Sequence, residues 1–96
     1  MARETQAIII NQKDNVATAL MELNAGTEVS VEFQGRVQKM TLLSDVPMGH
    51  KFALQDIQEG EAVIKYGESI GQSTVKITRG EHVHVHNVVS QPGGEW

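Results

Sequence analysis

The stretch Leu23-Asn24-Ala25-Gly26-Thr27-Glu28-Val29 decides the fold, because its pattern recurs twice further along the chain. The other copies are Ile57-Gln58-Glu59-Gly60-Glu61-Ala62-Val63 and Ile77-Thr78-Arg79-Gly80-Glu81-His82-Val83. Each copy has an apolar residue, two further residues, a glycine, two more residues and a valine. A glycine at that place permits a tight turn with a positive φ just before a strand begins. The copies are irregularly spaced, so they indicate turns in a compact, mainly β fold rather than solenoid repeats.

The sequence around these turns predicts short strands and one helix. Residues 28–33 and 36–43 flank Gln34-Gly35 and are expected to form a hairpin. Asp14 is a good helix N-cap, and apolar residues follow it at helical spacing until Gly26. We therefore expect one short helix over 15–24. The other expected strands are 7–11, 51–54, 62–65, 70–74 and 82–88, with a loop at 46–50.

The length and composition bound the class of protein. A chain of 96 residues fits one domain, with 1–6 and 90–96 expected as loose termini. The absence of cysteine excludes a disulfide framework and thiolate chemistry. The net charge is −4 and the basic residues are scattered, which argues against a nucleic-acid partner. No apolar run approaches the roughly 18–20 residues of a membrane span, and no secretory signal opens the chain. We expect a cytoplasmic protein with no membrane partner.

Three of the four histidines fall within His82-Val83-His84-Val85-His86. On one continuous strand, alternate side chains share a face, so these three imidazoles would lie next to one another. Imidazole is a common ligand of zinc and iron, so the pattern predicts a metal site. An ordinary solvent-facing strand edge explains the same pattern, and both interpretations stay open at the level of sequence.

Other polar residues are candidates for binding. His50 follows Pro47-Met48-Gly49 and is a candidate ligand, substrate contact or simple loop residue. Lys65 and Tyr66 have the chemistry to hydrogen-bond a hydroxy acid, although a strand-to-turn segment fits them equally well. No paired-carboxylate, Ser-His-Asp or phosphate-loop signature is visible, so the catalytic residues are unknown from the residues alone.

Four segments, spread over nearly the whole chain, carry a resemblance to a known family. They are Asp14-Asn15-Val16-Ala17-Thr18-Ala19-Leu20, Pro47-Met48-Gly49-His50-Lys51-Phe52-Ala53-Leu54, Val63-Ile64-Lys65-Tyr66-Gly67-Glu68-Ser69-Ile70-Gly71 and Gly80-Glu81-His82-Val83-His84-Val85-His86-Asn87. In this order they resemble the N-terminal SAF-type domain of the altronate/galactarate dehydratase family, and its altronate branch most closely. The resemblance implies a β-clip fold. It also implies a metal-dependent hydro-lyase, commonly with iron, that converts a 2,3-dihydroxy sugar acid to a 2-keto-3-deoxy acid.

The resemblance further implies a divided active site. In many family members this domain is fused to a much larger catalytic part, and in others it is a separate small subunit. A related two-subunit branch eliminates sulfite from sulfolactate. We therefore expect the chain to be inactive alone and to bind a large catalytic subunit through an apolar patch, with the tail near Trp96 as a candidate contact. A homo-oligomer is a further possibility.

On this basis the expected divalent metal, iron in the assembled enzyme, has three candidate ligands: His82, His84 and His86. The candidate contacts to a sugar-acid substrate are His50, Lys65, Tyr66 and Asn87. The competing hypothesis is a SAF-type module that binds or assembles without catalysis. The histidine-rich segment together with Lys65-Tyr66-Gly67 favours the dehydratase.

Overall fold

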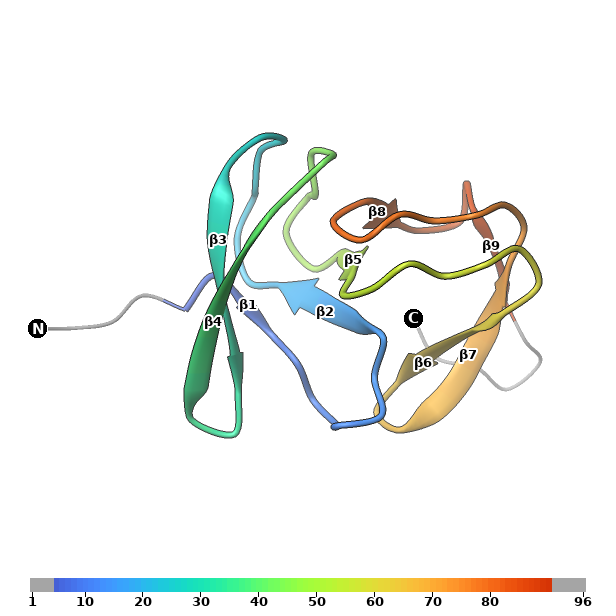
Figure 1. Cartoon of the computed structure of the whole chain (residues 1–96), viewed down its shortest axis with the longest axis horizontal. Helices are drawn as coiled ribbons and strands as arrows, with labels where there is room; N and C mark the ends of the chain where they lie inside the picture. The colour runs from blue at the N-terminus through green and yellow to red at the C-terminus, as the bar shows by residue number, and fades with distance from the viewer. Residues whose placement is uncertain (1–4, 91–96) are drawn as a thin grey trace, which may run out of the picture.

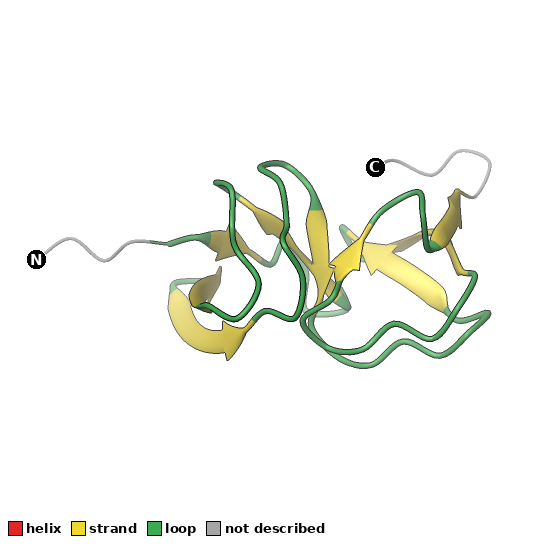
Figure 2. Cartoon of the chain, turned by 90° about the horizontal axis from the view of Figure 1, so that it is seen from above, coloured by secondary structure: helices red, strands yellow, loops and turns green. Residues whose placement is uncertain are grey.

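The computed structural model describes residues 5–90, which form nine short strands and no helix (Figures 1 and 2). The strands are β1 (Ala7–Ile8), β2 (Val16–Ala19), β3 (Glu28–Phe33), β4 (Arg36–Thr41), β5 (Lys51–Ala53), β6 (Ala62–Lys65), β7 (Glu68–Ser73), β8 (His82–Val83) and β9 (Val88–Ser90). The termini expected to be loose lie mostly outside the described residues. Within the described part, the Gln6 N–H donates to the Ser30 carbonyl, and Ser90 ends β9.

The strands form two sheets, which confirms the predicted mainly β, β-clip type of fold. The larger sheet has the order β4-β3-β1-β2-β5-β8 and the smaller one the order β6-β7-β9. Neighbouring strands are antiparallel except for β1 and β3, which run parallel. The β3–β4 hairpin lies at one end of the molecule and the β6–β7 hairpin at the other, with β2 and β5 between them (Figure 1).

Four tight turns fold these strands over one another. They cover residues 23–26, 46–49, 57–60 and 77–80, and each ends in a glycine with φ between 81° and 92°. The first residues of the turns pair as isolated bridges, Leu23 with Val46 and Ile57 with Ile77. Three of the turns are the recurring pattern of the sequence. The fourth, which begins at Val46, does not match that sequence pattern, because Phe52 occupies the position of the valine in the other three.

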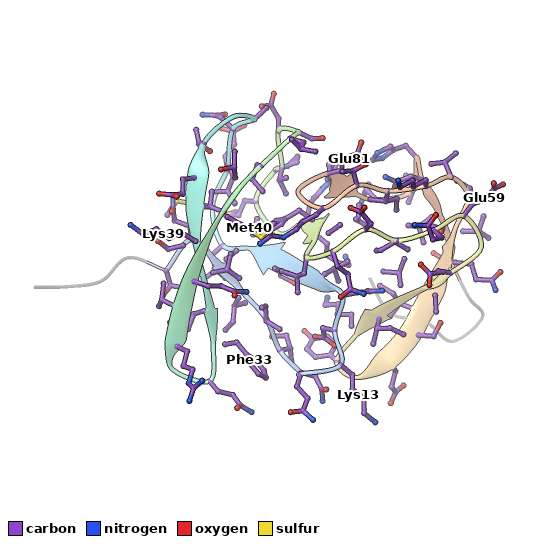
Figure 3. All side chains as sticks on the ribbon, viewed as in Figure 1. Lys13, Phe33, Lys39, Met40, Glu59 and Glu81 are labelled. Atoms are coloured by element: carbon purple, nitrogen blue, oxygen red, sulfur yellow. The ribbon has the colours of Figure 1, made fainter. Side chains whose placement is uncertain are left out.

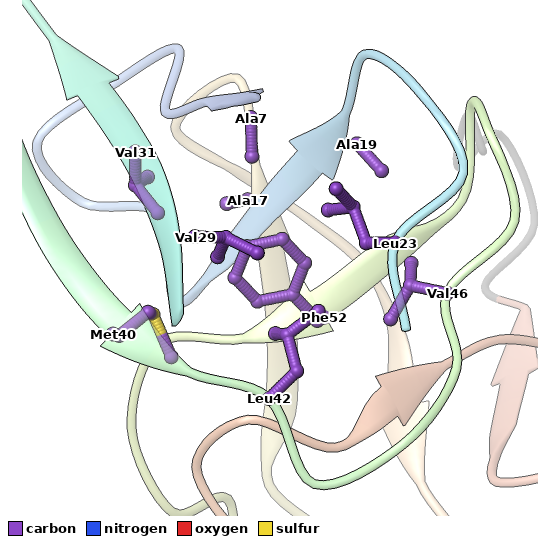
Figure 4. Packing of buried hydrophobic residues seen from close by; sticks show 10 residues of the cluster. All are labelled: Ala7, Ala17, Ala19, Leu23, Val29, Val31, Met40, Leu42, Val46 and Phe52. Carbon is purple, nitrogen blue, oxygen red and sulfur yellow. The ribbon is translucent and has the colours of Figure 1, made fainter. Parts of the chain in front are cut away.

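The apolar side chains gather in two cores, one for each half of the molecule. Phe52, which is fully buried, lies at the centre of the first core, among residues of β1 to β4 and of the first two turns (Figure 4). The second core joins the β6–β7 hairpin to residues of the last two turns and to Val83 of β8. Consecutive residues of β5 pack in different cores, since Phe52 lies in the first and Ala53 in the second. The strand that follows His50 is thereby fixed from both sides.

The helix expected over 15–24 is wrong, because Val16–Ala19 forms β2 between β1 and β5. Val16 packs in the second core while Ala17 and Ala19 pack in the first. A short strand that is buried on both faces is a continuous apolar run, and such a run cannot be told from a helix by its spacing. Asp14 is not a helix cap either. Its carboxylate accepts hydrogen bonds from the N–H groups of Asn11 (3.0 Å) and Gly67 (2.8 Å).

Candidate functional site: a histidine cluster

Two paired strands bring together histidines that lie more than thirty residues apart. In the antiparallel pair of β5 and β8, Phe52 is opposite His82 and Lys51 is opposite Val83. His50 precedes β5 and His84 follows β8, so the register continues to set these two rings against each other. Their centroids are 4.0 Å apart and their planes differ by 21°, which is a stacked arrangement.

His50, His82 and His84 form the compact part of the cluster. The Nδ1 atom of His50 lies 2.8 Å from Nε2 of His82, at hydrogen-bonding distance. One potential ligand nitrogen from each of the three rings lies within 4.8 Å of the other two. All three residues are half-buried, so the cluster is open to solvent on one side.

A turn, rather than a strand, carries the rest of the histidine-rich segment. The strand expected over 82–88 ends at Val83, and the chain resumes as β9 at Val88. The buried Asn87 side chain holds the turn, since its Oδ1 accepts from the His84 N–H (2.9 Å) and its Nδ2 donates to the His82 carbonyl (2.8 Å). An amide side chain that satisfies two backbone groups in this way competes with strand pairing.

The turn changes which histidines meet. His86 is exposed, and its ring is tilted against His82 with the centroids 5.1 Å apart. It lies outside the group of three nitrogens, whereas His50 lies within it. The sequence pointed to His82 and His84 correctly as neighbours, but it could not reveal that His50 joins them, because that depends on the pairing of β5 with β8.

The environment of two of the imidazoles, His82 and His84, favours their neutral form. Burial is the main cause that lowers the pKa of His82 to about 4, with smaller contributions from charge repulsion by His86, His50, His84 and Lys51. Burial also lowers the pKa of His84, with smaller effects from His50, Lys51 and His86. Metal binding requires the unprotonated ring nitrogen, so a lowered pKa prepares a histidine to act as a ligand near neutral pH.

Lys51 is the residue at this site that the sequence analysis missed. Its side chain is only 2% exposed, although lysine is among the residues least often buried. Burial lowers the pKa of Lys51 to about 8, and Lys65 contributes by repulsion. The residue follows His50 directly, and it is buried on one face of β5 while Phe52 is buried on the other. No pattern in the sequence distinguishes this lysine from an exposed one.

Lys65 and Tyr66 lie at the tip of the β6–β7 hairpin. Tyr66 and Gly67 both have positive φ angles, 56° and 77°, as the two central residues of a tight hairpin turn do. A positive φ is unfavourable for a bulky aromatic residue, and such positions are often functional. Lys65 is 8% exposed and its Nζ lies 4.7 Å from the centroid of the Tyr66 ring, which is itself half in solvent.

The donor set of the histidine cluster fits a transition-metal ion. Metal–imidazole bonds are about 2.0–2.1 Å long, so two nitrogens on one ion are roughly 3–3.5 Å apart. The spacing of 2.8 Å and the spread of up to 4.8 Å bracket that range, so small ring movements suffice. The proton between His50 and His82 must leave when both nitrogens bind. Three imidazole nitrogens suit zinc, iron, nickel or copper, with a coordination position left open.

The fold, with its short strands and glycine turns, is consistent with a β-clip domain of the SAF type. The chain belongs to the altronate/galactarate dehydratase SAF domain family, whose pattern matches residues 5–91. It is 54% identical over 82 residues to altronate dehydratase of Escherichia coli (strain K12), covering 85% of this chain. It is 34% identical over 84 residues to galactarate dehydratase (L-threo-forming) of the same organism, covering 85% of this chain. The chain spans 16% and 15% of the lengths of these two relatives.

In a third relative, the match covers most of the relative's own length. The chain is 38% identical over 84 residues to (2R)-sulfolactate sulfo-lyase subunit alpha of Chromohalobacter salexigens, and the match covers 84% of this chain and 89% of that subunit. Within the described residues, no helix is long and apolar enough to cross a membrane.

Proposed function

We propose that this chain is the SAF part of an altronate-type dehydratase. Together with a large catalytic subunit or domain, it would remove water from a 2,3-dihydroxy sugar acid to give a 2-keto-3-deoxy acid. The observation that supports this most is the imidazole cluster of His50, His82 and His84, in a chain 54% identical to an altronate dehydratase over the domain. The group of potential ligand atoms found within residues 5–90 contains histidines and no carboxylate, so we propose that the large partner supplies the rest of the site.

The role of the cluster in this proposal is to hold a divalent metal ion, iron in the assembled enzyme. A bound ion supplies Lewis-acid chemistry toward a carboxylate and a leaving hydroxyl. His50, His82 and His84 provide the nitrogens, and Asn87 positions two of them through the backbone. Burial keeps His82 and His84 unprotonated at neutral pH. Lys65 and Tyr66 remain candidate contacts for the oxyacid.

The large partner is proposed to cover the open side of the cluster. Met48, two residues before His50, is 69% exposed, and Val85, next to His84, is 68% exposed. Each of these apolar residues lies within two positions, along the chain, of one of the two stacked rings of His50 and His84. Apolar side chains this exposed around a polar cluster are typical of a surface that is buried on assembly. The tail near Trp96, the other expected contact, lies outside the described residues.

A second candidate function is the alpha subunit of a sulfolactate sulfo-lyase. The observation that favours it is coverage, because the match extends over 89% of that relative and only 16% of the altronate dehydratase. Both reactions eliminate a leaving group from the carbon β to a carboxylate, so the same cluster serves either. The substrate of the assembled enzyme separates the two candidates.

The metal proposal is tested with Co²⁺ as a coloured substitute for Fe²⁺, titrated into the full chain at pH 7.5. We expect His50→Ala, His82→Ala and His84→Ala each to weaken Co²⁺ binding at least tenfold. His86→Ala is the matched control, since it removes an exposed imidazole from the same turn. Loss of binding in His82→Ala, His84→Ala and His86→Ala, with His50→Ala unaffected, would restore the ligand set expected from the sequence. Unchanged binding in all four would show that the cluster is a solvated edge.

The assembly proposal is tested by mixing the chain with the part of altronate dehydratase that lies outside the matched region, or with the other subunit of the sulfolactate sulfo-lyase. We expect 2-keto-3-deoxy acid formation from altronate only when both parts are present. Sulfite release from (2R)-sulfolactate, without turnover of altronate, would select the second candidate instead. Turnover of altronate by the chain alone would contradict the divided site.

A further inference from the structure

The four glycine turns share one backbone hydrogen bond. In each turn, the N–H of the residue that follows the glycine donates to the carbonyl three positions earlier. The four pairs, with N···O distances between 2.8 and 3.4 Å, are Thr27 with Asn24 (3.3 Å), His50 with Pro47 (3.0 Å), Glu61 with Gln58 (2.9 Å) and Glu81 with Thr78 (2.9 Å). The residue after the glycine therefore occupies the same place in every turn, and the side chains at that place can be compared directly.

In three of the four turns, the side chain at this place bonds back to the residue three positions earlier. Two carboxylates accept from a backbone N–H, and one hydroxyl donates to a backbone carbonyl. The pairs are Glu61 with Gln58 (2.6 Å), Glu81 with Thr78 (2.5 Å) and Thr27 with Asn24 (2.6 Å). Local bonds of this kind from a side chain to the backbone stabilise a turn. The side chain after the glycine is thus ordinarily used to hold its own turn.

His50 is the exception among these four residues. Within residues 5–90, the hydrogen-bond contact of its ring is with His82 on β8, where Nδ1 of His50 and Nε2 of His82 are 2.8 Å apart. Pro47 explains the difference, because proline has no backbone N–H. The donor that the two glutamates bind in their own turns does not exist at residue 47. Nδ1 of His50 therefore has no N–H to bind at that place.

A backbone N–H at residue 47 would compete for this atom. Nδ1 of His50 lies two bonds beyond Cβ, whereas the hydroxyl oxygen of Thr27 lies one bond beyond Cβ and the carboxylate oxygens of Glu61 lie three bonds beyond. Both the shorter and the longer side chain reach the residue three positions earlier. An unprotonated Nδ1 accepts a hydrogen bond, as a carboxylate oxygen does. With a donor at residue 47, the His50 ring would have two alternative partners.

We propose that Pro47 is a positioning residue for the candidate metal site, because its missing N–H releases the His50 ring from its own turn and directs Nδ1 to His82. Glu81 provides the contrast, since it is next to His82 and lies beside β8 (Figure 3). Its carboxylate is bound to the Thr78 N–H, and it lies outside the group of potential ligand atoms found in the described part of the chain. The use of the ring by a metal ion rests on the proposed function, whereas the effect of Pro47 on the partner of the ring does not.

Two replacements at residue 47 separate the missing N–H from the stiffness of the proline ring. Pro47→Ala introduces an N–H. An ester variant, with L-lactic acid in place of residue 47 by in vitro translation, removes the proline ring and still has no N–H. Nuclear Overhauser effects between the His50 and His82 rings are measured on the metal-free full chain. We expect the ring contact to persist in the ester variant and to weaken in Pro47→Ala, whose new amide should show a hydrogen bond to Nδ1 of His50.

Titration with Co²⁺ measures the consequence for the site. We expect Pro47→Ala to raise the Kd by about threefold to tenfold, as competition from one hydrogen bond implies, and the ester variant to keep the parental Kd. Gln58→Ala is the matched control at the same place in another turn. Figure 3 shows Glu59, the next residue of that turn, at the end of the molecule away from β8. Equal losses in the alanine and ester variants would overturn the proposal, as would an unchanged ring contact in Pro47→Ala.

A second measurement tests directly whether residues 47 and 50 can pair. Pro47→Thr combined with His50→Glu reproduces the arrangement of Thr78 and Glu81. Pro47→Thr should therefore lower the melting temperature less in the His50→Glu background than in the His50→Ala background, where no side chain can bind the new N–H. Equal effects in the two backgrounds would show that the side chain of residue 50 does not reach residue 47, which contradicts the proposal.

The outcome for Pro47 is distinguishable from the outcome for the metal. A chain in which the N–H of residue 47 weakens the contact of the His50 and His82 rings, but which binds no Co²⁺, keeps the positioning role and rejects the metal role. A ring contact that is the same in all residue-47 variants, with Co²⁺ bound normally, overturns the role of Pro47 and leaves the proposed function standing.

Discussion

The protonation of His82 makes the free energy of unfolding of the chain depend on pH. The unfolded chain takes up a proton at His82 near pH 6.5, whereas burial keeps the folded chain neutral there until about pH 4. Between these values the unfolded state binds more protons, so the free energy of unfolding decreases as the pH falls from 6.5 toward 4. Below that range His82 contributes no further change.

We therefore predict a fall in urea stability of the metal-free chain between pH 6.5 and pH 4, to which His84 adds because its pKa is also lowered. Chemical unfolding at pH 7, 5.5 and 4.5 measures it. His82→Gln should flatten the dependence, while His86→Ala should keep most of it, because burial is the largest cause of the lowered pKa. If the free energy of unfolding of His82→Gln depends on pH as strongly as that of the unsubstituted chain, the pH dependence comes from other groups.

Asn87 is the residue that shapes the turn carrying His84. Its amide is buried and makes one hydrogen bond as acceptor and one as donor to that turn. Asn87→Ala leaves both backbone groups without these bonds, so we expect a loss of about 2–3 kcal/mol in the free energy of unfolding. Asn87→Asp keeps the acceptor for the His84 N–H and should lose less. Thermal melting of the three chains checks the order, and equal melting temperatures would contradict it.

At the scale of elements, Asn15 joins β2 to the β6–β7 hairpin. Its Nδ2 donates to the Ala62 carbonyl (2.9 Å) and its Oδ1 accepts from the Ile64 N–H (2.8 Å), across an irregularity in the pairing of β6 with β7. The side chain thus makes two hydrogen bonds to the backbone of β6, as a neighbouring strand would. This attachment fixes the hairpin that carries Lys65 relative to the sheet that carries the histidines.

We expect Asn15→Ala to lower the free energy of unfolding by about 1–3 kcal/mol, because two buried backbone groups lose their partner. Asn24→Ala, at an exposed position, is the control and should change it by no more than about 0.5 kcal/mol. Hydrogen exchange provides a second measurement. Faster exchange confined to the Ile64 amide and its β6 neighbours is expected in Asn15→Ala, and uniform exchange across the chain would contradict a local attachment.

At the scale of the whole molecule, the exposed apolar residues beside the cluster predict where a large partner docks. Met48→Glu and Val85→Glu place a charge at the proposed interface without disturbing either core, since both side chains are more than two-thirds exposed. We expect each to weaken association with the large subunit at least tenfold while the melting temperature of the chain stays the same. Val75→Glu is the control, because Val75 is exposed and lies in the turn region after β7. An equal effect of all three substitutions on association would place the interface elsewhere.

The sequence by itself determined the mainly β class, the hairpin around Gln34-Gly35, three of the four glycine turns and the segment that carries three histidines. These features are local, since a few neighbouring residues determine a glycine turn or an alternating strand. The tertiary structure decided which groups meet. Val16–Ala19 became a strand because two cores bury it from both sides, which overrides a helical spacing. His50 joined His82 and His84, and Lys51 came to lie buried beside them, because β5 pairs with β8 in one register. Such pairing depends on contacts between residues about thirty positions apart, and no short stretch of sequence encodes it.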